Sequence, residues 1–209
     1  MNKTIIITSY MENSDNFSHF VTPKDYIICT DGGYDIALKY NLKPDLLLGD
    51  FDSITAPLPN DVETIKFNPE KDFTDLDLAL KHAAEISSSS VEIWGGLGGR
   101  FDHTMANIQL LSCYCDKFSN LTIMDGRNKC MCVNASDEQI IKIPAEYGTY
   151  ISLFALSETV TISSSGVKYP LDGYILKRTF PLGVSNEFTS EEAIIKIENG
   201  TLLIVLSKM

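Results

Sequence analysis

The chain has 209 residues, of which 44% are hydrophobic and 22% are charged. This composition excludes an intrinsically disordered chain and a coiled coil, and the length suits one or two globular domains. The net charge of −11 argues against a nucleic-acid partner. An acidic surface repels phosphate backbones unless basic residues gather in a patch, and the sequence has no such patch.

Membrane and secreted proteins are two further classes that the sequence argues against. The longest apolar runs, such as Ile5–Ile7 and Leu202–Leu206, have the length of strands, whereas a membrane-spanning helix needs about 18 apolar residues. The N-terminus lacks the apolar stretch of a signal peptide. Five cysteines, an odd number, then predict reduced thiols in a cytoplasmic protein. The two Cys-x-Cys pairs lack zinc-site spacing and are interpreted as buried thiols.

The first 126 residues alternate between strand and helix patterns. Short apolar or β-branched runs predict strands, and apolar residues at helical spacing predict helices. The strands are expected over 4–8, 26–30, 46–48, 63–67, 91–94 and 121–124, and the helices over 34–40, 74–86 and 102–118. Such alternation is typical of βαβ units, so we expect a mainly parallel, Rossmann-like α/β domain.

The two longer helices each have a predicted inward face. Thr74, followed three positions later by Asp77, is close to a capping box and predicts the start of the first of them. The apolar residues of these faces are Leu76, Leu80, Ala83 and Ala84 in the first helix, and Met105, Ile108, Leu111 and Cys115 in the second.

The character of the chain changes after residue 126. Strand patterns separated by Gly, Pro, Asn and Ser turns follow one another, and no helix is predicted. These strands are expected over 129–133, 138–143, 150–156, 159–163, 193–198 and 201–207. We therefore expect an α/β domain over 1–126 and an all-β domain, a β-sandwich, over 127–209.

Acidic residues follow two of the predicted parallel strands. Asp31 follows one strand, and Asp50 and Asp52 follow another, at the edge where open parallel sheets bind ligands. Two carboxylates two residues apart point the same way in extended chain and raise each other's pKa unless a cation neutralises them. Magnesium is the natural cation for such a pair. The alternative, a pair of turn-forming aspartates, stays open here.

A second polar cluster begins the helix predicted over 74–86. Thr74 and Asp75 lie where unpaired backbone N–H groups and the positive end of the helix dipole favour anions. Helix capping by itself explains Thr74 and Asp77, but it explains Lys71 and Asp72 less well.

Four glycines between residues 95 and 99 connect a predicted strand to a helix and are followed by Arg100, Asp102 and His103. Glycines let the backbone approach a ligand closely, and an arginine forks onto two phosphate oxygens. The loop has neither the lysine of a Walker A motif nor the last glycine of G-x-G-x-x-G. Asp102 is interpreted as a helix cap, a ligand of magnesium-bound water or a base. His103 alone favours local hydrogen bonding.

Metal-binding carboxylates, an arginine, a lysine and glycine-rich loops at strand ends together favour phosphoryl-type transfer. The all-β half would then shape a pocket for the acceptor. Its most site-like segment is Gly183–Phe188, where Ser185 and Asn186 offer a hydroxyl and an amide. An ordinary Ser-Asn turn is the alternative.

The ordered set of motifs resembles the thiamine pyrophosphokinase family over nearly the whole chain. The resembling segments are 30–33, 44–54, 71–77, 95–107, 166–171 and 183–188. Any one of them is weak, whereas Gly-Asp-Phe-Asp-Ser-Ile at 49–54 together with Gly-Gly-Arg-Phe-Asp-His at 98–103 is specific. The departures, such as Thr30, Asp77, Met105 and Val167, remove no charge or donor.

The resemblance implies transfer of pyrophosphate from ATP to the hydroxyl of thiamine, giving thiamine diphosphate and AMP, with magnesium as cofactor. It also implies a homodimer whose active site is shared between subunits. In-line attack on the β-phosphorus would follow, with Asp75 or Asp102 accepting the hydroxyl proton.

The resemblance also assigns residues to these roles. The catalytic set is Asp50, Asp52, Asp75, Arg100 and Asp102, of which Asp50, Asp52 and Asp75 hold the metal. The residues that bind ATP are Asp31, Gly32, Gly33, Lys71, Asp72, Thr74, Arg100 and His103. Those that bind thiamine are Asn107 and, from the β domain of the partner subunit, Ser185 and Asn186.

Two other functions remain to be compared with this one. Asp50-Phe51-Asp52-Ser53 after an apolar strand also resembles the nucleophile motif of haloacid-dehalogenase-type phosphatases. That interpretation leaves the glycine-rich block and the β domain unexplained. The second alternative is a non-catalytic regulator that binds nucleotide or thiamine, but no metal-binding carboxylate or arginine has been lost.

Overall fold

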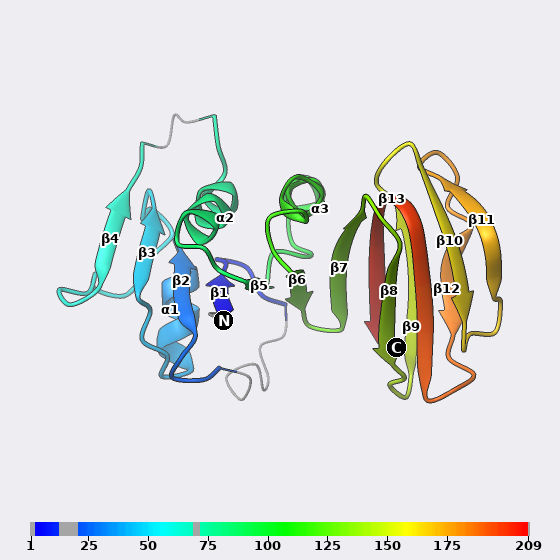
Figure 1. Cartoon of the computed structure of the whole chain (residues 1–209). Helices are drawn as coiled ribbons and strands as arrows, with labels where there is room; N and C mark the ends of the chain where they lie inside the picture. Colours follow the sequence, from blue (N-terminus) through cyan, green and yellow to red (C-terminus); the bar gives the residue numbers. More distant parts are fainter. Residues whose placement is uncertain (1–2, 13–20, 69–71, 209) are drawn as a thin grey trace. The chain divides into compact units, whose positions relative to one another are not determined.

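The protein is described from a computed structural model that covers residues 3–12, 21–68 and 72–208. It divides into two compact units, Met1–Gly126 and Arg127–Met209, and each unit is considered by itself (Figure 1). The expected order is confirmed: a parallel α/β unit is followed by a unit built from strands. None of the helices in the described ranges is long and apolar enough to cross a membrane.

The first unit is built on six parallel strands in the order β4–β3–β2–β1–β5–β6. Their bounds are β1 Lys3–Ile7, β2 Tyr26–Thr30, β3 Leu46–Gly49, β4 Glu63–Lys66, β5 Ser90–Trp94 and β6 Asn120–Asp125. The chain places β2 to β4 on one side of β1 and β5 and β6 on the other. The strand order therefore reverses between β1 and β5, which is where such sheets bind ligands.

Three helices accompany this sheet: α1 Gly33–Lys39, α2 Asp75–Glu85 and α3 Phe101–Tyr114. Alternate strand residues such as Ile5, Cys29 and Leu47 share one core cluster with Ala37 of α1. Their neighbours in sequence point to the opposite face. Both faces of the central strands are buried, which explains why these strands read as continuous apolar runs.

The predicted start of α2 is confirmed. Thr74 is the N-cap, and its side-chain oxygen accepts a hydrogen bond from the backbone N–H of Asp77 at 3.2 Å. The buried face is nearly the predicted one, but it contains Ala79 in place of Ala84.

The prediction for α3 was less accurate. The helix ends at Tyr114, short of the predicted residue 118, and Met105 is 46% exposed. Within the helix the buried residues are Asn107 and Leu111, four residues apart, so the buried face keeps Leu111 of the predicted face but contains Asn107 and not Met105. Cys115 is buried as expected, whereas Cys113 is exposed.

The second unit consists of two antiparallel sheets that share one long strand, β13 (Glu192–Lys208). One sheet has the order β8–β13–β10–β11 and the other β7–β13–β9–β12. The bounds are β7 Asn128–Ala135, β8 Gln139–Pro144, β9 Thr149–Ala155, β10 Thr159–Ser165, β11 Leu171–Lys177 and β12 Gly183–Glu187. Apolar residues of both sheets form one core, in the manner of a sandwich.

The sequence wrongly predicts two strands and a turn where β13 runs without interruption. Its first half pairs with β8 and β10, and from Gly200 onward it pairs with β7 and β9. The register against β10 shifts by one residue before Asn199, and the buried positions change from Ile195 and Ile197 to Leu202 and Ile204. Gly200 has φ +91, and a Cβ there would lie 2.5 Å from the carbonyl oxygen of Thr159. The Asn-Gly pair is thus the bend at which the strand passes from one sheet to the other.

Two strands, β11 and β12, were not predicted. Most of their residues are exposed, so they lack the apolar pattern that marks a strand in the sequence. They are strands because they pair with β10 and β9 respectively.

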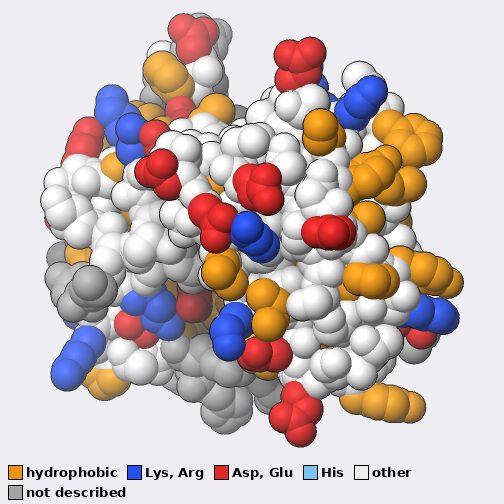
Figure 2. Space-filling model, turned by 45° about the vertical axis from the view of Figure 1, so that its right-hand side comes forward, with side chains coloured by type: hydrophobic (Ala, Val, Ile, Leu, Met, Phe, Trp, Pro, Cys, Tyr) orange, Lys and Arg blue, Asp and Glu red, His pale blue; other side chains and the backbone are white. Residues whose placement is uncertain are grey.

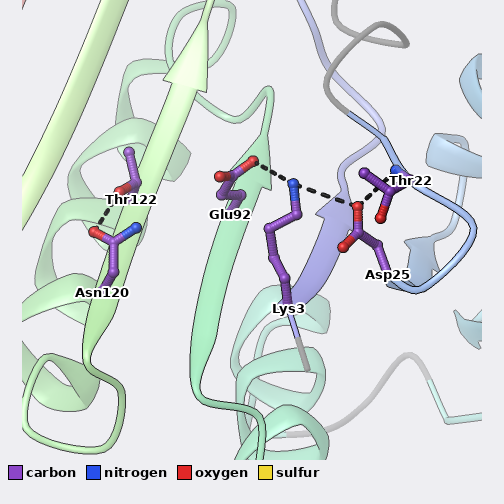
Figure 3. A network of polar contacts seen from close by, with 6 residues as sticks. All are labelled: Lys3, Thr22, Asp25, Glu92, Asn120 and Thr122. Atoms are coloured by element: carbon purple, nitrogen blue, oxygen red, sulfur yellow. Dashed lines mark hydrogen bonds and ion pairs between the residues drawn. The ribbon is translucent and has the colours of Figure 1, made fainter. Parts of the chain in front are cut away.

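A polar network crosses the sheet of the first unit near the start of β1 (Figure 3). The Lys3 ammonium lies 3.4 Å from a carboxylate oxygen of Asp25 and 3.4 Å from one of Glu92. Asp25 also accepts a hydrogen bond from the backbone N–H of Thr22 at 2.7 Å. The Asp25 side chain is only 7% exposed, so losing the lysine beside it destabilises the fold more than the same loss beside a surface carboxylate.

We expect Lys3→Met to destabilise the protein by about 1 kcal/mol, because it leaves two partly buried carboxylates without their cation. The matched control is Lys43→Met, which breaks an ion pair with Asp61 whose side chains are 66% and 73% exposed. The control should leave the urea midpoint unchanged. Equal shifts for the two variants would show that the Lys3 network contributes no more than a surface pair.

Candidate active site

The carboxyl edge of the first unit's sheet gathers four aspartates. Asp31 follows β2, Asp50 and Asp52 follow β3, and Asp75 begins α2. The side chains of Asp31 and Asp75 are hydrogen-bonded, and those of Asp50 and Asp52 are also hydrogen-bonded. The sequence predicted that Asp31, Asp50 and Asp52 share one edge, and the structure places them there together with Asp75.

Neighbouring aspartates contribute to a raised pKa of Asp31 and of Asp52. Burial raises the pKa of Asp31 to about 7, with further contributions from the hydrogen bond to Asp75 and from the charges of Asp75 and Asp50. The charge of Asp50 is the main cause of the raised pKa of Asp52. Four carboxyl groups held in this way concentrate negative charge, which a proton or a cation can neutralise.

This concentration of negative charge fits a divalent cation. Over the residues that the structure describes, no three His, Cys, Asp or Glu side chains are already arranged to hold a metal. Magnesium, however, uses one or two carboxylates and completes its octahedron with water and phosphate oxygens. The donors at this edge are therefore of the right kind and number for magnesium bound together with a phosphate ligand.

The Gly-Asp-Phe-Asp segment owes its shape to Asp31. A Cβ on Gly49, which has φ +146, would lie 1.8 Å from Oδ1 of Asp31, so no other residue fits there. The same oxygen accepts a hydrogen bond from the backbone N–H of Phe51 at 3.0 Å. Phe51 has φ +68, an uncommon conformation for a bulky residue. Asp31 is thus a structural partner of the loop that carries Asp50 and Asp52.

The glycine-rich loop after β5 is held by three side chains, one from the end of β6 and two from α3. The backbone N–H of Leu97 donates to Asp125 at 3.0 Å, and that of Gly98 donates to Thr104 at 2.9 Å. The side-chain amide of Asn107 donates to the carbonyl of Gly96 at 2.8 Å. Asn107, expected to bind thiamine, is buried and supports the loop through this hydrogen bond.

Arg100 and Asp102 form an exposed bidentate pair. The guanidinium donates to the two carboxylate oxygens at 3.2 and 2.6 Å. This pairing lowers the pKa of Asp102 to about 2 and raises that of Arg100. Arg100 is the N-cap of α3 and its side chain makes no cap hydrogen bond, whereas Oδ1 of Asp102 accepts a hydrogen bond from the backbone N–H of His103 in the first turn at 3.0 Å. The neighbouring His103 is exposed at the same helix start.

The remaining predicted nucleotide contacts lie around the starts of α1 and α2. Gly32 donates its backbone N–H to Oγ of Ser53 at 3.0 Å, and a Cβ on Gly33 would meet the carbonyl oxygen of Ile7 at 2.1 Å. Asp72 is exposed immediately before the Thr74 cap. Lys71 lies outside the described residues.

Ser185 and Asn186 lie in β12 of the second unit. The Asn186 side chain accepts a hydrogen bond from the backbone N–H of Tyr169 at 3.0 Å and donates one to its carbonyl at 2.8 Å. It thereby ties together the segments 166–171 and 183–188, which were separate in the sequence. Ser185 is exposed, with φ +58, and its backbone N–H donates to Oγ of Ser152 at 2.9 Å. Both residues therefore lie in strand β12, at a register shift against β9, and not in a simple Ser-Asn turn. This part of the sheet, with Tyr169, is called the corner below.

Three polar groups at or near the carboxyl edge of the first unit's sheet were not singled out from the sequence. Asp125 ends β6 and accepts backbone hydrogen bonds from Glu12 at 2.7 Å and from Leu97. Tyr10 follows β1, and its ring lies against Gly98 and Gly99. Asp35 of α1 contacts the loop after β3. The position of Asp125 at a strand end, like that of Asp31, was a usable signal, whereas Tyr10 and Asp35 gave none.

Two family models match the chain. Residues 17–124 match the thiamin pyrophosphokinase catalytic domain, and residues 138–203 match the thiamin pyrophosphokinase vitamin B1 binding domain.

Curated relatives and solved structures agree with these matches. Thiamine pyrophosphokinase of Bacillus subtilis is 32% identical over 186 residues, 86% of this chain and 86% of the relative. Thiamin pyrophosphokinase 1 of Caenorhabditis elegans is 28% identical over 183 residues, 82% of this chain and 74% of the relative. The crystal structure of the Bacillus subtilis protein superposes with a TM-score of 0.88, covering 100% of this chain and 99% of that one at 27% identity.

Asp125 predicts a pH dependence of stability. Burial raises its pKa to about 6, although two backbone hydrogen bonds oppose the shift. Because the folded protein binds this proton more tightly than the unfolded chain, Asp125 makes the free energy of unfolding fall as the pH rises from about 4 to about 6. When the pH falls from 7 to 5, Asp125 should therefore add about 1 kcal/mol to the free energy of unfolding of the natural protein. Asp125→Asn lacks the titrating carboxyl group, so its free energy of unfolding should not gain this contribution. Urea unfolding at the two pH values measures the difference, and identical pH dependence would contradict it.

Proposed function

The chain belongs to the thiamin pyrophosphokinase family, and from this premise we propose how its own residues perform the family's reaction. The enzyme transfers pyrophosphate from ATP to the hydroxyl of thiamine, giving thiamine diphosphate and AMP. The observation that carries the proposal is the group of four interacting aspartates at the carboxyl edge of the first unit's sheet. The phosphatase interpretation accounts for Asp50 and Asp52 but not for the glycine-rich loop or the second unit, and a non-catalytic regulator would not need to keep every metal-binding carboxylate.

We assign Mg²⁺ to the carboxylates of Asp50, Asp52 and Asp75. When bound, the ion neutralises negative charge on the transferred phosphates. The raised pKa of Asp52 supports this assignment, because repulsion from Asp50 is its main cause and a cation relieves that repulsion. Asp31 stays in place as the partner of Asp75 and of the Phe51 backbone.

The nucleotide phosphates are proposed to lie along the glycine-rich loop and the starts of α2 and α3. Arg100 would bind them through the same two-pronged geometry with which it now binds Asp102. Little free energy is needed to rearrange an exposed ion pair. Asp102 can therefore orient the guanidinium of Arg100 and still release it to bind a phosphate. Lys71, Asp72, Thr74 and His103 complete the proposed contacts.

Asp75 is the better candidate for the group that accepts the thiamine hydroxyl proton. Asp102 binds Arg100, and its pKa of about 2 makes it a weak base. Asp75 lies instead among the proposed metal ligands and is hydrogen-bonded to Asp31, at the edge where the reaction is proposed to occur.

The second unit is proposed to bind thiamine through Ser185 and Asn186, with Asn107 on the first unit as a further contact. The hydrogen bonds from Asn186 to Tyr169 fix the corner in which Ser185 is displayed. The thiazolium ring of thiamine is a cation, and the chain's net charge of −11 favours its approach.

Apolar side chains exposed on the second unit support a homodimer with a shared site. Figure 2 shows apolar side chains gathered along the right-hand side of the view. Those exposed on and between β11 and β12 are Tyr174, Ile175, Phe180, Leu182 and Val184. A surface of this kind beside Ser185 is typical of a protein interface. We also propose that the enzyme is cytoplasmic, because five cysteines, an odd number, fit reduced thiols.

The reaction predicts equal amounts of AMP and thiamine diphosphate. The purified chain is incubated with thiamine, ATP and Mg²⁺, and the products are separated by chromatography with and without a chelator. Chelation should stop the reaction, and adding Mg²⁺ back should restore it. ADP with thiamine monophosphate would contradict attack on the β-phosphorus, and inorganic phosphate alone would favour the phosphatase.

A shared site predicts complementation between two inactive variants. Asp52→Asn removes a proposed metal ligand and Asn186→Ala removes the proposed thiamine corner, so each alone should lose at least about 100-fold in kcat/KM. Mixed by unfolding and refolding together, random assortment makes half of the dimers mixed, each with one intact site, which restores about a quarter of the natural activity. No recovery, with mixed dimers present by mass spectrometry, would place both residues in the same subunit's site.

A further inference from the structure

The loop that follows β3 is anchored by a carboxylate to which neither the motif nor the proposed mechanism assigns a role. Asp35, in the first turn of α1, accepts three hydrogen bonds from this loop. Its Oδ2 accepts from the backbone N–H of Thr55 and from the Thr55 hydroxyl, each at 2.8 Å, and its Oδ1 accepts from the backbone N–H of Ala56 at 2.9 Å. Both carboxylate oxygens are therefore used on one short segment.

Two weaker attachments hold the same loop nearer to Asp50. Oδ1 of Asp31 accepts the backbone N–H of Phe51, and Oγ of Ser53 accepts the backbone N–H of Gly32. Asp31 and Gly32 belong to the short segment that connects β2 to α1, and Asp35 lies in the first turn of α1. The loop carrying the metal-binding carboxylates is thus aligned on that segment and the first turn of α1, and Asp35 supplies the last and most extensive of the attachments.

The loop needs such support because its backbone is strained. Phe51 keeps φ +68 between Asp50 and Asp52, and such a conformation persists only where the surroundings impose it. Ile54 and Ala56 add partly buried apolar contacts. Apolar contacts are non-directional, so they hold the loop near α1 without setting the direction of the two carboxylates.

We propose that Asp35 is a positioning residue of the reaction: by holding the backbone at Thr55 and Ala56, its carboxylate sets where Asp50 and Asp52 present theirs. The inference rests on the proposed metal-binding role of those two aspartates. Asp35 itself touches neither metal nor substrate. Its effect is on how well the loop is pre-formed, and a carboxylate displaced by about 1 Å at a metal site costs a large part of its function.

The test is Asp35→Asn, which keeps the size of the side chain but turns one acceptor oxygen into a donor that faces N–H groups. The matched control is Asp61→Asn, the same chemical change at an exposed aspartate of the same unit. Thr55→Val is the milder variant, since it removes only the hydroxyl hydrogen bond and leaves both backbone hydrogen bonds to Asp35 in place.

Hydrogen exchange measures how firmly Asp35 holds the backbone at Thr55 and Ala56, independently of enzyme activity. In Asp35→Asn, the amides of Thr55 and Ala56 should exchange about tenfold faster or more, with strands β1 and β2 unchanged. Thr55→Val should show a smaller increase, and Asp61→Asn none. Unchanged exchange at residues 55 and 56 in Asp35→Asn would overturn the proposal.

Metal binding and kinetics measure the consequence. Mn²⁺ titration followed by electron paramagnetic resonance should show binding weakened about fivefold or more in Asp35→Asn. The Mg²⁺ concentration for half-maximal activity should rise, and kcat should fall while the KM for thiamine stays within about twofold. Asp35→Glu, which restores the charge, should recover part of the loss. Faster exchange with natural metal affinity and kcat would reduce Asp35 to a structural residue and also overturn the proposal.

Failure of the proposed function has a different signature. If the natural protein neither binds Mn²⁺ nor needs a metal for turnover, the assignment of Asp50 and Asp52 fails, and the positioning role fails with it whatever the exchange data show. If the natural protein binds Mn²⁺ and Asp35→Asn binds it equally well, only the role of Asp35 fails.

Discussion

The six strands of the first unit all run in the same direction, and this single constraint brings the candidate active site together. Parallel strands end at one edge of their sheet, so residues that follow β2, β3, β5 and β6 meet there although they are far apart in the chain. The aspartates, the glycine-rich loop and Asp125 all lie at this edge. A strand running the other way would send its terminal residue to the opposite edge, where Lys3 and Asp25 lie.

Carboxylates gathered at one edge repel one another, and nearby backbone N–H groups offset part of this repulsion. Asp31 is buried beside other acids, and its carboxylate accepts a backbone N–H from the very loop that carries Asp50 and Asp52. Asp35 accepts three hydrogen bonds from the end of that loop. The backbone N–H groups thus supply part of the positive potential that the acids need, and the bound cation is proposed to supply the rest.

The second unit holds the exposed segment that contains Ser185 and Asn186 in a fixed shape. Its two sheets depend on the one long strand β13, whose halves pair with different partners on either side of Gly200. On the core built in this way, β11 and β12 can expose nearly all of their side chains and still be ordered. Asn186 then joins two segments of the corner through the backbone of Tyr169.

The sequence by itself determined the class of the fold, the order of the two units, the start of α2 at Thr74 and the aspartates that share the carboxyl edge. These follow from local patterns: runs of buried residues, helical spacing, and acids placed directly after strands. Only the tertiary structure decided that residues 192–208 form one strand, that β11 and β12 are strands, that Met105 faces outward, and that Asp35 and Asp125 hold the loops of the site. Each of these depends on partners distant in the chain, because the pairing of mostly exposed strands, the packing of α3 and side-chain to backbone hydrogen bonds are set by residues that local sequence patterns do not identify.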